Sequence, residues 1–389
     1  MNRLLTCFAL IAATVCTPIA SASEALRIGF LTTLSGQGAA IGQDIRDGFA
    51  LGVKHNGGRL GGVPLDIQYV DDQLSPESAR QSADRFIKLN KVDIVTGVVY
   101  GSVLIPILPA ILASDTVYIS TNPGPADYAG TKCHKNFFVA ALQNEDIPQA
   151  MGRYAASKSY KRVALIAANY PGGREAVVGF KRQFKEAAIE EIYTKLGQLD
   201  YASEIVTLRE SKPEAIFFML PGAMGINFIK QFEAAGLTKQ IALLAPGYSA
   251  DEDTIRAVGD PMVGVFNASH WAAELPGALN QKFVTDFTAT YGRPPTINAS
   301  QGYDTALLID HAVRTVGGKF RDREVLRQAL RRAEFQSLRG LFRFNTNQFP
   351  IHTLYLRVVQ KDASGKIHNK LVGELLRNHS DPYAVECKL

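Results

Sequence analysis

Residues 26–72 contain a strand, a loop of small residues, a helix and a second strand, and this order restricts the chain to an α/β fold. Apolar residues fill Leu26–Leu31, the loop follows at Ser35–Gly38, and a helical pattern occupies Gln43–Lys54. A second apolar run, Leu65–Val70, ends in two aspartates. Strands rich in Val, Ile and Leu are typical of parallel sheets covered on both faces. The segment therefore predicts the opening of a fold like those that bind nucleotides.

The alternation of strands and helices continues in two series along the chain. The first series adds the strands Asp93–Gly97 and Thr116–Ser120. The strands of the second series are Arg162–Ala167, Glu191–Leu196, Ala215–Leu220, Ile241–Ala245 and Met262–Phe266. Two such series predict an α/β fold with two doubly wound lobes, each built on its own parallel sheet. The length of 389 residues also suits two domains better than one simple core.

The segment after Trp271 differs, because long helical patterns come before three late strands. The helices are predicted at Asn280–Tyr291, Ser300–Thr315 and Arg323–Arg332, and the strands at Phe342–Asn345, Thr353–Gln360 and Lys370–Glu374. We place hinge crossovers between the lobes at Phe137–Ala141, Phe266–Trp271 and Asn345–Tyr355. The first lobe is thus expected to comprise residues 23–140 and 272–345, and the second lobe residues 141–271 and 346–389.

The first 22 residues have the pattern of a signal peptide. Arg3 gives a positive start, Leu4–Val15 is apolar, and Ala20-Ser21-Ala22 is a cleavage site of the small-x-small type. The apolar run is shorter than the roughly 20 residues that a membrane span requires, so an anchor is the weaker alternative. Cys16 suggests a lipoprotein as a further alternative, but Thr14-Val15 before it fits a lipobox poorly. The mature protein is therefore expected to be exported and soluble.

Two of the four cysteines remain after residue 22. Cys133 and Cys387 are an even pair in an oxidising compartment, and we predict that they form a disulfide. Such a bond would tie the C-terminal tail to the body of the protein. The alternative is two free thiols that lie far apart.

The charged residues and histidines do not point to a nucleic acid, a metal or a catalyst. The net charge of +5 is mild and dispersed, and no basic-aromatic stripe accompanies the short basic clusters, which favours solvated helix surfaces over nucleic-acid binding. The seven histidines lack the spacing of metal ligands. Gly247–Asp251 resembles a nucleophile elbow but lacks its second glycine. We expect a protein that is not an enzyme and holds no cofactor.

The loop Gly36-x-Gly38-x-x-x-Gly42 resembles a dinucleotide-binding fingerprint. An exported protein has no nucleotide supply, which favours a tight turn and a helix start over an exported oxidoreductase. The backbone N–H groups of such a turn can still bind an anion, including a carboxylate. Asp71-Asp72 suggests cation binding, but a capping role at a strand end is the favoured interpretation.

Small and polar residues follow five of the predicted strands, in both lobes. Ligands of open α/β sheets bind at these carboxyl ends, where glycine allows close approach, asparagine and serine donate hydrogen bonds, and tyrosine offers an apolar face. Glycine and asparagine also make ordinary turns, but five such loops favour a shared cleft. The candidate ligand-binding residues are Tyr100, Gly101, Ser102, Asn122, Gly124, Asn169, Tyr170, Gly222, Gly247 and Tyr248.

Four segments carry a resemblance to a known family that covers nearly the whole mature chain. They read LRIGFLTTLSGQGAAIGQDIRDGFALGVKHNGGRLGG, DIVTGVVYGS, ISTNPGP and FFVAALQNEDIPQAMGRYAASKSYKRVALIAANYPGGREAVVGFKRQF. The chain resembles the leucine/isoleucine/valine-binding proteins, the type I periplasmic solute-binding proteins of ABC importers. The last segment is most similar to the subgroup associated with aromatic and other non-standard carboxylates.

The resemblance implies how a ligand would be held. In amino-acid-binding members a serine after the third strand and a threonine after the fourth strand hold the ligand's carboxylate. In this chain Ser102 matches the serine, whereas Gly124 stands in place of the threonine. The turn that normally supplies an acid for the ligand's ammonium reads Ala245–Tyr248 here and contains none. A buried ammonium without a counter-charge costs several kcal/mol. We therefore expect a carboxylate without an ammonium, with an aromatic acid favoured, unless Asp251, Glu252 or Asp253 supplies the charge.

The resemblance also implies the partners of the protein. It predicts a monomeric periplasmic protein that captures a small carboxylate between its lobes and delivers it to permease subunits in the inner membrane. The alternatives are a branched-chain amino acid or amide binder of the same transporter type, an exported ligand sensor and an exported oxidoreductase.

Overall fold

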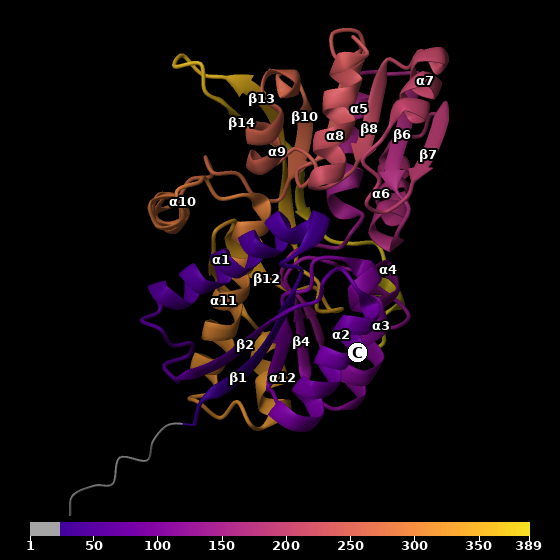
Figure 1. Cartoon of the computed structure of the whole chain (residues 1–389). Coiled ribbons are helices and arrows are strands. Elements are labelled where there is room, and N and C mark those ends of the chain that lie inside the picture. Colours follow the sequence, from indigo (N-terminus) through magenta and orange to yellow (C-terminus); the bar gives the residue numbers. More distant parts are fainter. Residues whose placement is uncertain (1–23) are drawn as a thin grey trace, which may run out of the picture.

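The computed structural model describes residues 24–389, which form two sheets that lie one above the other in Figure 1. The predicted signal peptide and Cys16 lie outside the described residues. We call the elements around the lower sheet the first lobe and those around the upper sheet the second lobe. Both sheets are flanked by helices, as the alternating pattern predicted.

The first sheet is entirely parallel. Its strand order is β2-β1-β3-β4-β5. The bounds are β1 (Leu26–Thr32), β2 (Leu65–Asp71), β3 (Ile94–Thr96), β4 (Val117–Ser120) and β5 (Phe137–Val139). The residues of the central strands β1, β3 and β4 are buried except for the half-buried Arg27, because helices cover both faces.

Two pairs of helices cover the faces of the first sheet (Figure 1). On one face α1 (Ala39–His55) packs against α11 (Ile297–Thr315), and on the other α2 (Pro76–Arg85) packs against α3 (Gly101–Ala113). A side chain on Gly48 of α1 would overlap the carbonyl oxygen of Ala299, so the glycine allows close contact with α11. This contact fixes the start of α11, which matters for the cavity below.

The second sheet is mixed. Its order is β14-β13-β10-β9-β8-β6-β7, and the last five strands in this order are parallel. The bounds are β6 (Val163–Ala168), β7 (Glu190–Thr194), β8 (Ala215–Met219), β9 (Ala242–Pro246), β10 (Phe266–Ser269), β13 (His352–Lys361) and β14 (Ile367–His379). The prediction of a parallel sheet holds for those five, whereas β13 and β14 pair antiparallel and extend one edge.

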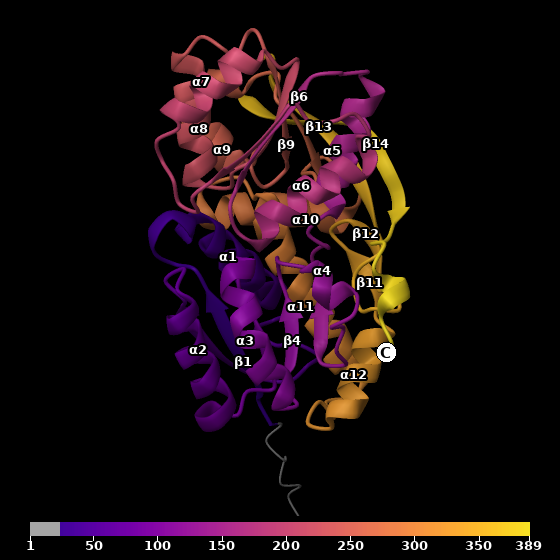
Figure 2. The same cartoon turned by 90° about the vertical axis from the view of Figure 1, so that its right-hand side faces the viewer.

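Helices also cover both faces of the second sheet (Figure 2). One face carries α5 (Asp146–Ser157) and α6 (Pro171–Gln183), and the other carries α7 (Ala202–Ser211), α8 (Ala223–Ala234) and α9 (Glu252–Val258). The remaining elements are α4 (Ala126–Ala129), α10 (Ala278–Tyr291), α12 (Arg323–Arg331) and the hairpin of β11 (Glu334–Ser337) with β12 (Gly340–Arg343).

The chain passes between the two sheets three times: after β5, after β10 and after β12. The predicted strand Met262–Phe266 is wrong, because residues 260–262 form a 3₁₀ turn and β10 follows at Phe266–Ser269. β10 lies within the stretch Phe266–Trp271 that we predicted as a crossover, and its half-polar sequence, FNAS, did not mark it as a strand of the sheet. The lobe boundaries at residues 140/141, 271/272 and 345/346 stay a prediction.

Buried charged and histidine side chains join the three passages. Asp146, at the start of α5, accepts hydrogen bonds from His352 (3.1 Å) and His379 (2.9 Å). Burial raises the pKa of Asp146, but these two bonds outweigh it and hold the pKa at about 2. The ring of His270, just after β10, stacks on that of His352 with centroids 5.8 Å apart. The connections between lobes are therefore packed together.

The predicted disulfide between Cys133 and Cys387 is confirmed, with Cα atoms 5.6 Å apart. Cys133 lies between α4 and β5 of the first lobe, whereas Cys387 follows β14 of the second. The tail beyond β14 is also held by Tyr383, which donates to Glu145 and accepts from Arg182. The bond therefore adds a covalent link between the lobes beyond the three chain passages.

Candidate ligand-binding site

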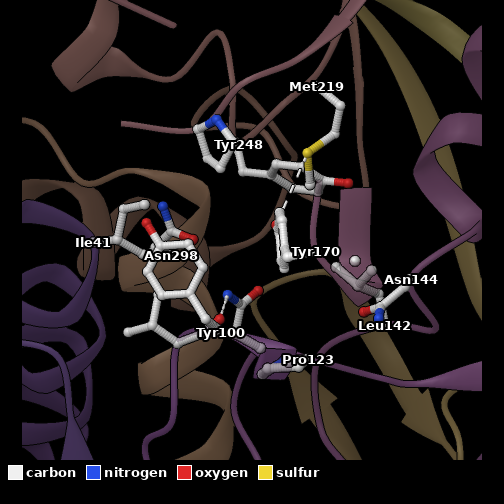
Figure 3. Close-up of a pocket in the computed structure, with 14 residues that line it drawn as sticks. Ile41, Tyr100, Pro123, Leu142, Asn144, Tyr170, Met219, Tyr248 and Asn298 are labelled. Atoms are coloured by element: carbon white, nitrogen blue, oxygen red, sulfur yellow. Dashed lines mark hydrogen bonds between the residues drawn. The ribbon is translucent and has the colours of Figure 1, made fainter. Parts of the chain in front are cut away.

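A cavity of about 490 Å³, its open mouth included, lies between the two lobes (Figure 3). Five of the candidate residues line it, and they come from both lobes. They are Tyr100, Gly101, Asn122, Tyr170 and Tyr248.

Most of these residues follow the carboxyl ends of parallel strands. Tyr100 and Gly101 follow β3, Asn122 follows β4, Tyr170 follows β6 and Tyr248 follows β9. Parallel strands in one sheet end at the same edge, so loops that are distant in sequence meet there. The cavity thus lies where the carboxyl edges of the two sheets face each other.

Three tyrosines form the aromatic walls. The rings of Tyr100 and Tyr170 meet edge to face across the lobes, with centroids 5.9 Å apart. The hydroxyl of Tyr170 lies 3.9 Å from the sulfur of Met219. Burial raises the pKa of Tyr100, Tyr170 and Tyr248, so all three are neutral at physiological pH. None of the side chains that line this cavity carries a formal charge.

Two helix N-termini, one from each lobe, face the cavity. Gly101 is the first residue of α3, and Gly172 is the second residue of α6. The first backbone N–H groups of a helix have no partner within the helix, and the helix dipole favours an anion beside them. Only Pro171 lies within 4 Å of the position that a Cβ on Gly101 would take, so the two helix starts adjoin each other. The cavity therefore offers neutral donors suited to a carboxylate.

Three asparagines supply the remaining polar lining. Asn122 donates to the carbonyl of Val99 at 2.8 Å. Asn144 accepts from the N–H of Gly124 at 2.8 Å and donates to Glu175. Asn298, on α11, makes no side-chain hydrogen bond to any described residue, although both its amide atoms are buried.

The lobes touch each other around the cavity. Gln37 of the first lobe donates to the carbonyl of Gly197 in the second at 2.9 Å. Glu175, on α6, accepts from the N–H of Ala126 at 3.0 Å and from Asn144. Burial raises the pKa of Glu175 to about 7, although these two hydrogen bonds lower it. The two lobes are thus in direct contact with each other, as in a closed clamshell.

The other five candidates lie outside the cavity lining. Ser102 is half-buried beside it on α3, and Gly124 is buried with its N–H bonded to Asn144. The exposed Asn169 accepts from Arg174, and Gly247 packs against Arg357. Gly222 is the N-cap of α8 and has a φ of 63°, which favours glycine.

The three acids that follow Tyr248 also lie outside this lining. Asp251 caps α9 by accepting from the N–H of Thr254 at 2.8 Å, Glu252 accepts from Asn369, and Asp253 pairs with Arg256. Asp251 and Asp253 line a neighbouring cavity of about 730 Å³. Asp44, on α1, lines the same cavity. Burial, followed by the charge of Asp253, raises the pKa of Asp44 to about 8.

The glycine loop after β1 brings helix and strand into close contact. A side chain on Gly42 would overlap the carbonyl of Thr33, and one on Gly38 would overlap the ring of Tyr100. Asp71 accepts from the N–H of Leu34 at 2.8 Å, and Asp72 from the hydroxyl of Thr33 at 2.7 Å. The two aspartates therefore brace this loop, which agrees with the capping interpretation.

Nine lining residues were not among the candidates. Several adjoin a candidate in sequence and carry the same strand-end signal, but Ile41 and Asn298 lie on helices without such a signal. The nine are Ile41, Val99, Pro123, Leu142, Asn144, Gly172, Met219, Pro221 and Asn298.

Residues 24–389 contain neither a candidate metal site nor a helix that could span a membrane. No group of three or more His, Cys, Asp or Glu side chains is arranged to hold a metal ion. No described helix combines the length and apolarity that crossing a membrane requires.

Comparisons with known proteins point to one family. A family model described as periplasmic binding protein matches residues 25–366. The Leu/Ile/Val-binding protein homolog 6 of Brucella melitensis is 24% identical over 377 residues, which cover 93% of this chain and 94% of the relative.

Solved structures extend the similarity to the fold. A solute-binding protein of an ABC transporter from Rhodopseudomonas palustris, in complex with benzoate, is 30% identical with a TM-score of 0.88, covering 94% of this chain and 100% of that one. A second, from R. palustris BisB5 in complex with 3,4-dihydroxy benzoic acid, is 26% identical with a TM-score of 0.87, covering 92% and 99%. The chain therefore belongs to the periplasmic binding protein family.

Proposed function

We propose that this protein is the substrate-binding component of an ABC transporter and that its ligand is a small aromatic carboxylate. The observation that carries the proposal is the cavity between the lobes, which combines tyrosine walls, two helix N-termini and an uncharged lining. The relatives bound to benzoate and 3,4-dihydroxy benzoic acid support the same ligand class.

The walls of the cavity suit a flat apolar ring. Tyr100, Tyr170 and Tyr248 present ring faces and edges, and Leu142 and Met219 add apolar surface. Aromatic pairs with centroids 4.5–7 Å apart gain about 0.5–1.5 kcal/mol beyond the burial of their area. A ring inserted between tyrosines can make more than one such pair, whereas an aliphatic side chain gains only its buried area.

The carboxylate would lie at the helix starts marked by Gly101 and Gly172. Backbone N–H groups and helix dipoles stabilise an anion without a cationic side chain. Neutral donors also cost less to bury in the absence of ligand than an arginine or lysine would.

An α-amino group has no counter-charge in this cavity. The lining contains no carboxylate, and Asp251 and Asp253 face the neighbouring cavity instead. Burying an ammonium there would cost several kcal/mol. A branched-chain amino acid therefore fits less well than an aromatic acid.

Delivery to a permease follows from closure of the lobes on the ligand. A ligand that contacts both lobes stabilises the closed form, and the closed form presents one arrangement of outer surfaces to the permease subunits. The protein would act in the periplasm as a monomer and catalyse no reaction.

A thermal-shift screen tests the ligand class. Benzoates, cinnamates, leucine and simple amides are each added at increasing concentration, and the unfolding midpoint is measured. A ligand at about 100 times its Kd stabilises the folded state by about 2.7 kcal/mol, so the aromatic acids should raise the midpoint. A rise with leucine and none with any aromatic acid would refute the proposal.

A further inference from the structure

Asn298 is the one asparagine of the cavity lining whose side chain is not already bonded. Its amide oxygen and nitrogen are both buried, the residue is 1% exposed, and neither atom bonds to a described residue. The amides of Asn122 and Asn144 are, in contrast, engaged by Val99, Gly124 and Glu175. Buried polar groups are rarely left without partners, so an unbonded amide in a ligand cavity indicates a contact to the ligand.

The position of Asn298 is fixed by the helix that carries it. The residue is the second of α11, and its backbone N–H donates to the capping hydroxyl of Thr296 at 3.1 Å. The next residue, Ala299, packs directly on Gly48 of α1. In Figure 3 Asn298 lies with Ile41 on one side of the cavity, opposite Leu142 and Asn144. The amide is therefore held at one side of the cavity by rigid elements.

The chemistry of an amide selects its partner. An amide offers a donor and an acceptor side by side. A carboxylate only accepts and an ammonium only donates, so each would satisfy one half of the amide and leave the other unpaired. A phenolic hydroxyl both donates and accepts, and it is neutral at physiological pH. Among the polar groups common on aromatic acids, a ring hydroxyl therefore satisfies both amide atoms, whereas the carboxylate satisfies only one.

We propose that Asn298 selects aromatic acids that carry a ring hydroxyl in addition to the carboxylate. The inference rests on the proposed function, in which the carboxylate occupies the helix starts at Gly101 and Gly172. Asn298 then contacts the other polar group of the same ligand and sets the preference for a hydroxylated ring over a plain one.

Calorimetric titration of the wild-type protein and of Asn298→Leu tests this. The ligands are benzoate, 3-hydroxybenzoate and 4-hydroxybenzoate. The wild type should bind one of the hydroxybenzoates at least tenfold more tightly than benzoate, because a hydroxyl that pairs both amide atoms is favoured over leaving them unpaired. Asn298→Leu keeps a similar volume and should lose this preference, so that it binds benzoate and the two hydroxybenzoates with affinities within threefold of one another.

Two controls keep the result interpretable. Asn298→Ala provides a smaller side chain if leucine does not fit, and unfolding midpoints show that both variants fold. Equal affinity of the wild type for benzoate and both hydroxybenzoates, or an equal loss for all three in the variants, overturns the role of Asn298 alone. Absence of binding of any aromatic acid to the wild type overturns the proposed function and this inference with it.

Discussion

Removing the disulfide between Cys133 and Cys387 should destabilise the protein without changing its ligand affinity. The perturbation is the double variant Cys133→Ala/Cys387→Ala, expressed without residues 1–22, so that no other cysteine remains. The bond joins two residues that are 254 positions apart in the sequence. In the unfolded chain it therefore closes a very long loop.

The loop length sets the expected size of the effect. The chain-entropy relation gives about 5.5 kcal/mol at 25 °C for a loop of this length, and residual structure in the unfolded chain reduces such values. We expect a loss of about 3–5 kcal/mol in the free energy of unfolding. Ligand affinity should stay within threefold of the wild type, because neither cysteine lines the cavity.

Urea unfolding followed by tryptophan fluorescence measures this loss. The single tryptophan, Trp271, is fully buried and donates to Asn280 at 2.8 Å, so its emission reports the fold at the second passage between the lobes. A loss below about 1 kcal/mol would refute the view that the bond closes a long, otherwise free loop. A large loss of ligand affinity would refute the view that the tail is independent of the cavity.

Three further predictions concern the cavity and its surroundings. Gly101→Leu should lower the affinity for benzoate at least about 100-fold by filling the space at the helix start. Gly373→Leu, at a glycine outside the cavity lining where no atom lies within 4 Å of an added Cβ, should leave the affinity unchanged. Calorimetry compares the two variants, and equal affinities would contradict the assignment. Glu175 is buried between the lobes with a pKa raised from 4.5 to about 7, so closure of the lobes takes up a proton. The affinity for ligand should therefore fall, by up to about 100-fold, as the pH rises from 5 to 8. Titrations across this range should show a weaker dependence of the affinity on pH for Glu175→Gln than for the wild type. Burial lowers the pKa of His270 well below 6.5, so the folded state holds the neutral ring. Below pH 6.5, protonation of this histidine in the unfolded chain destabilises the folded state by up to about 1.4 kcal/mol per pH unit. Urea unfolding at pH 5 and 7 should show that His270→Phe loses this share of the acid sensitivity.

The strands of the fold could be read from the sequence where they are apolar and parallel. β6 and β8 are uninterrupted runs of buried apolar residues, and β1 is interrupted only at the half-buried Arg27; such runs are typical of parallel strands covered on both faces. β10 was misplaced because Asn267 and Ser269 are polar and are buried by pairing with β9 and β13. The antiparallel pair of β13 and β14 likewise depends on pairing with β10, which lies far from both strands in the sequence.

The candidate site could be predicted where it lies at strand ends. Tyr100, Asn122, Tyr170 and Tyr248 each follow an apolar run, so the topology alone brings them together. Asn298 could not be found in this way, because it lies at the start of a helix that packs on α1. Its place in the cavity follows from close helix contact, which no local pattern reveals.

The most direct test of the account is a calorimetric titration of the wild-type protein with benzoate, a hydroxybenzoate and leucine at pH 7. The account predicts that aromatic acids bind with one site per chain and that leucine does not bind, because the cavity offers tyrosine walls and neutral donors but no carboxylate for an ammonium. Binding of leucine without binding of either aromatic acid would contradict it.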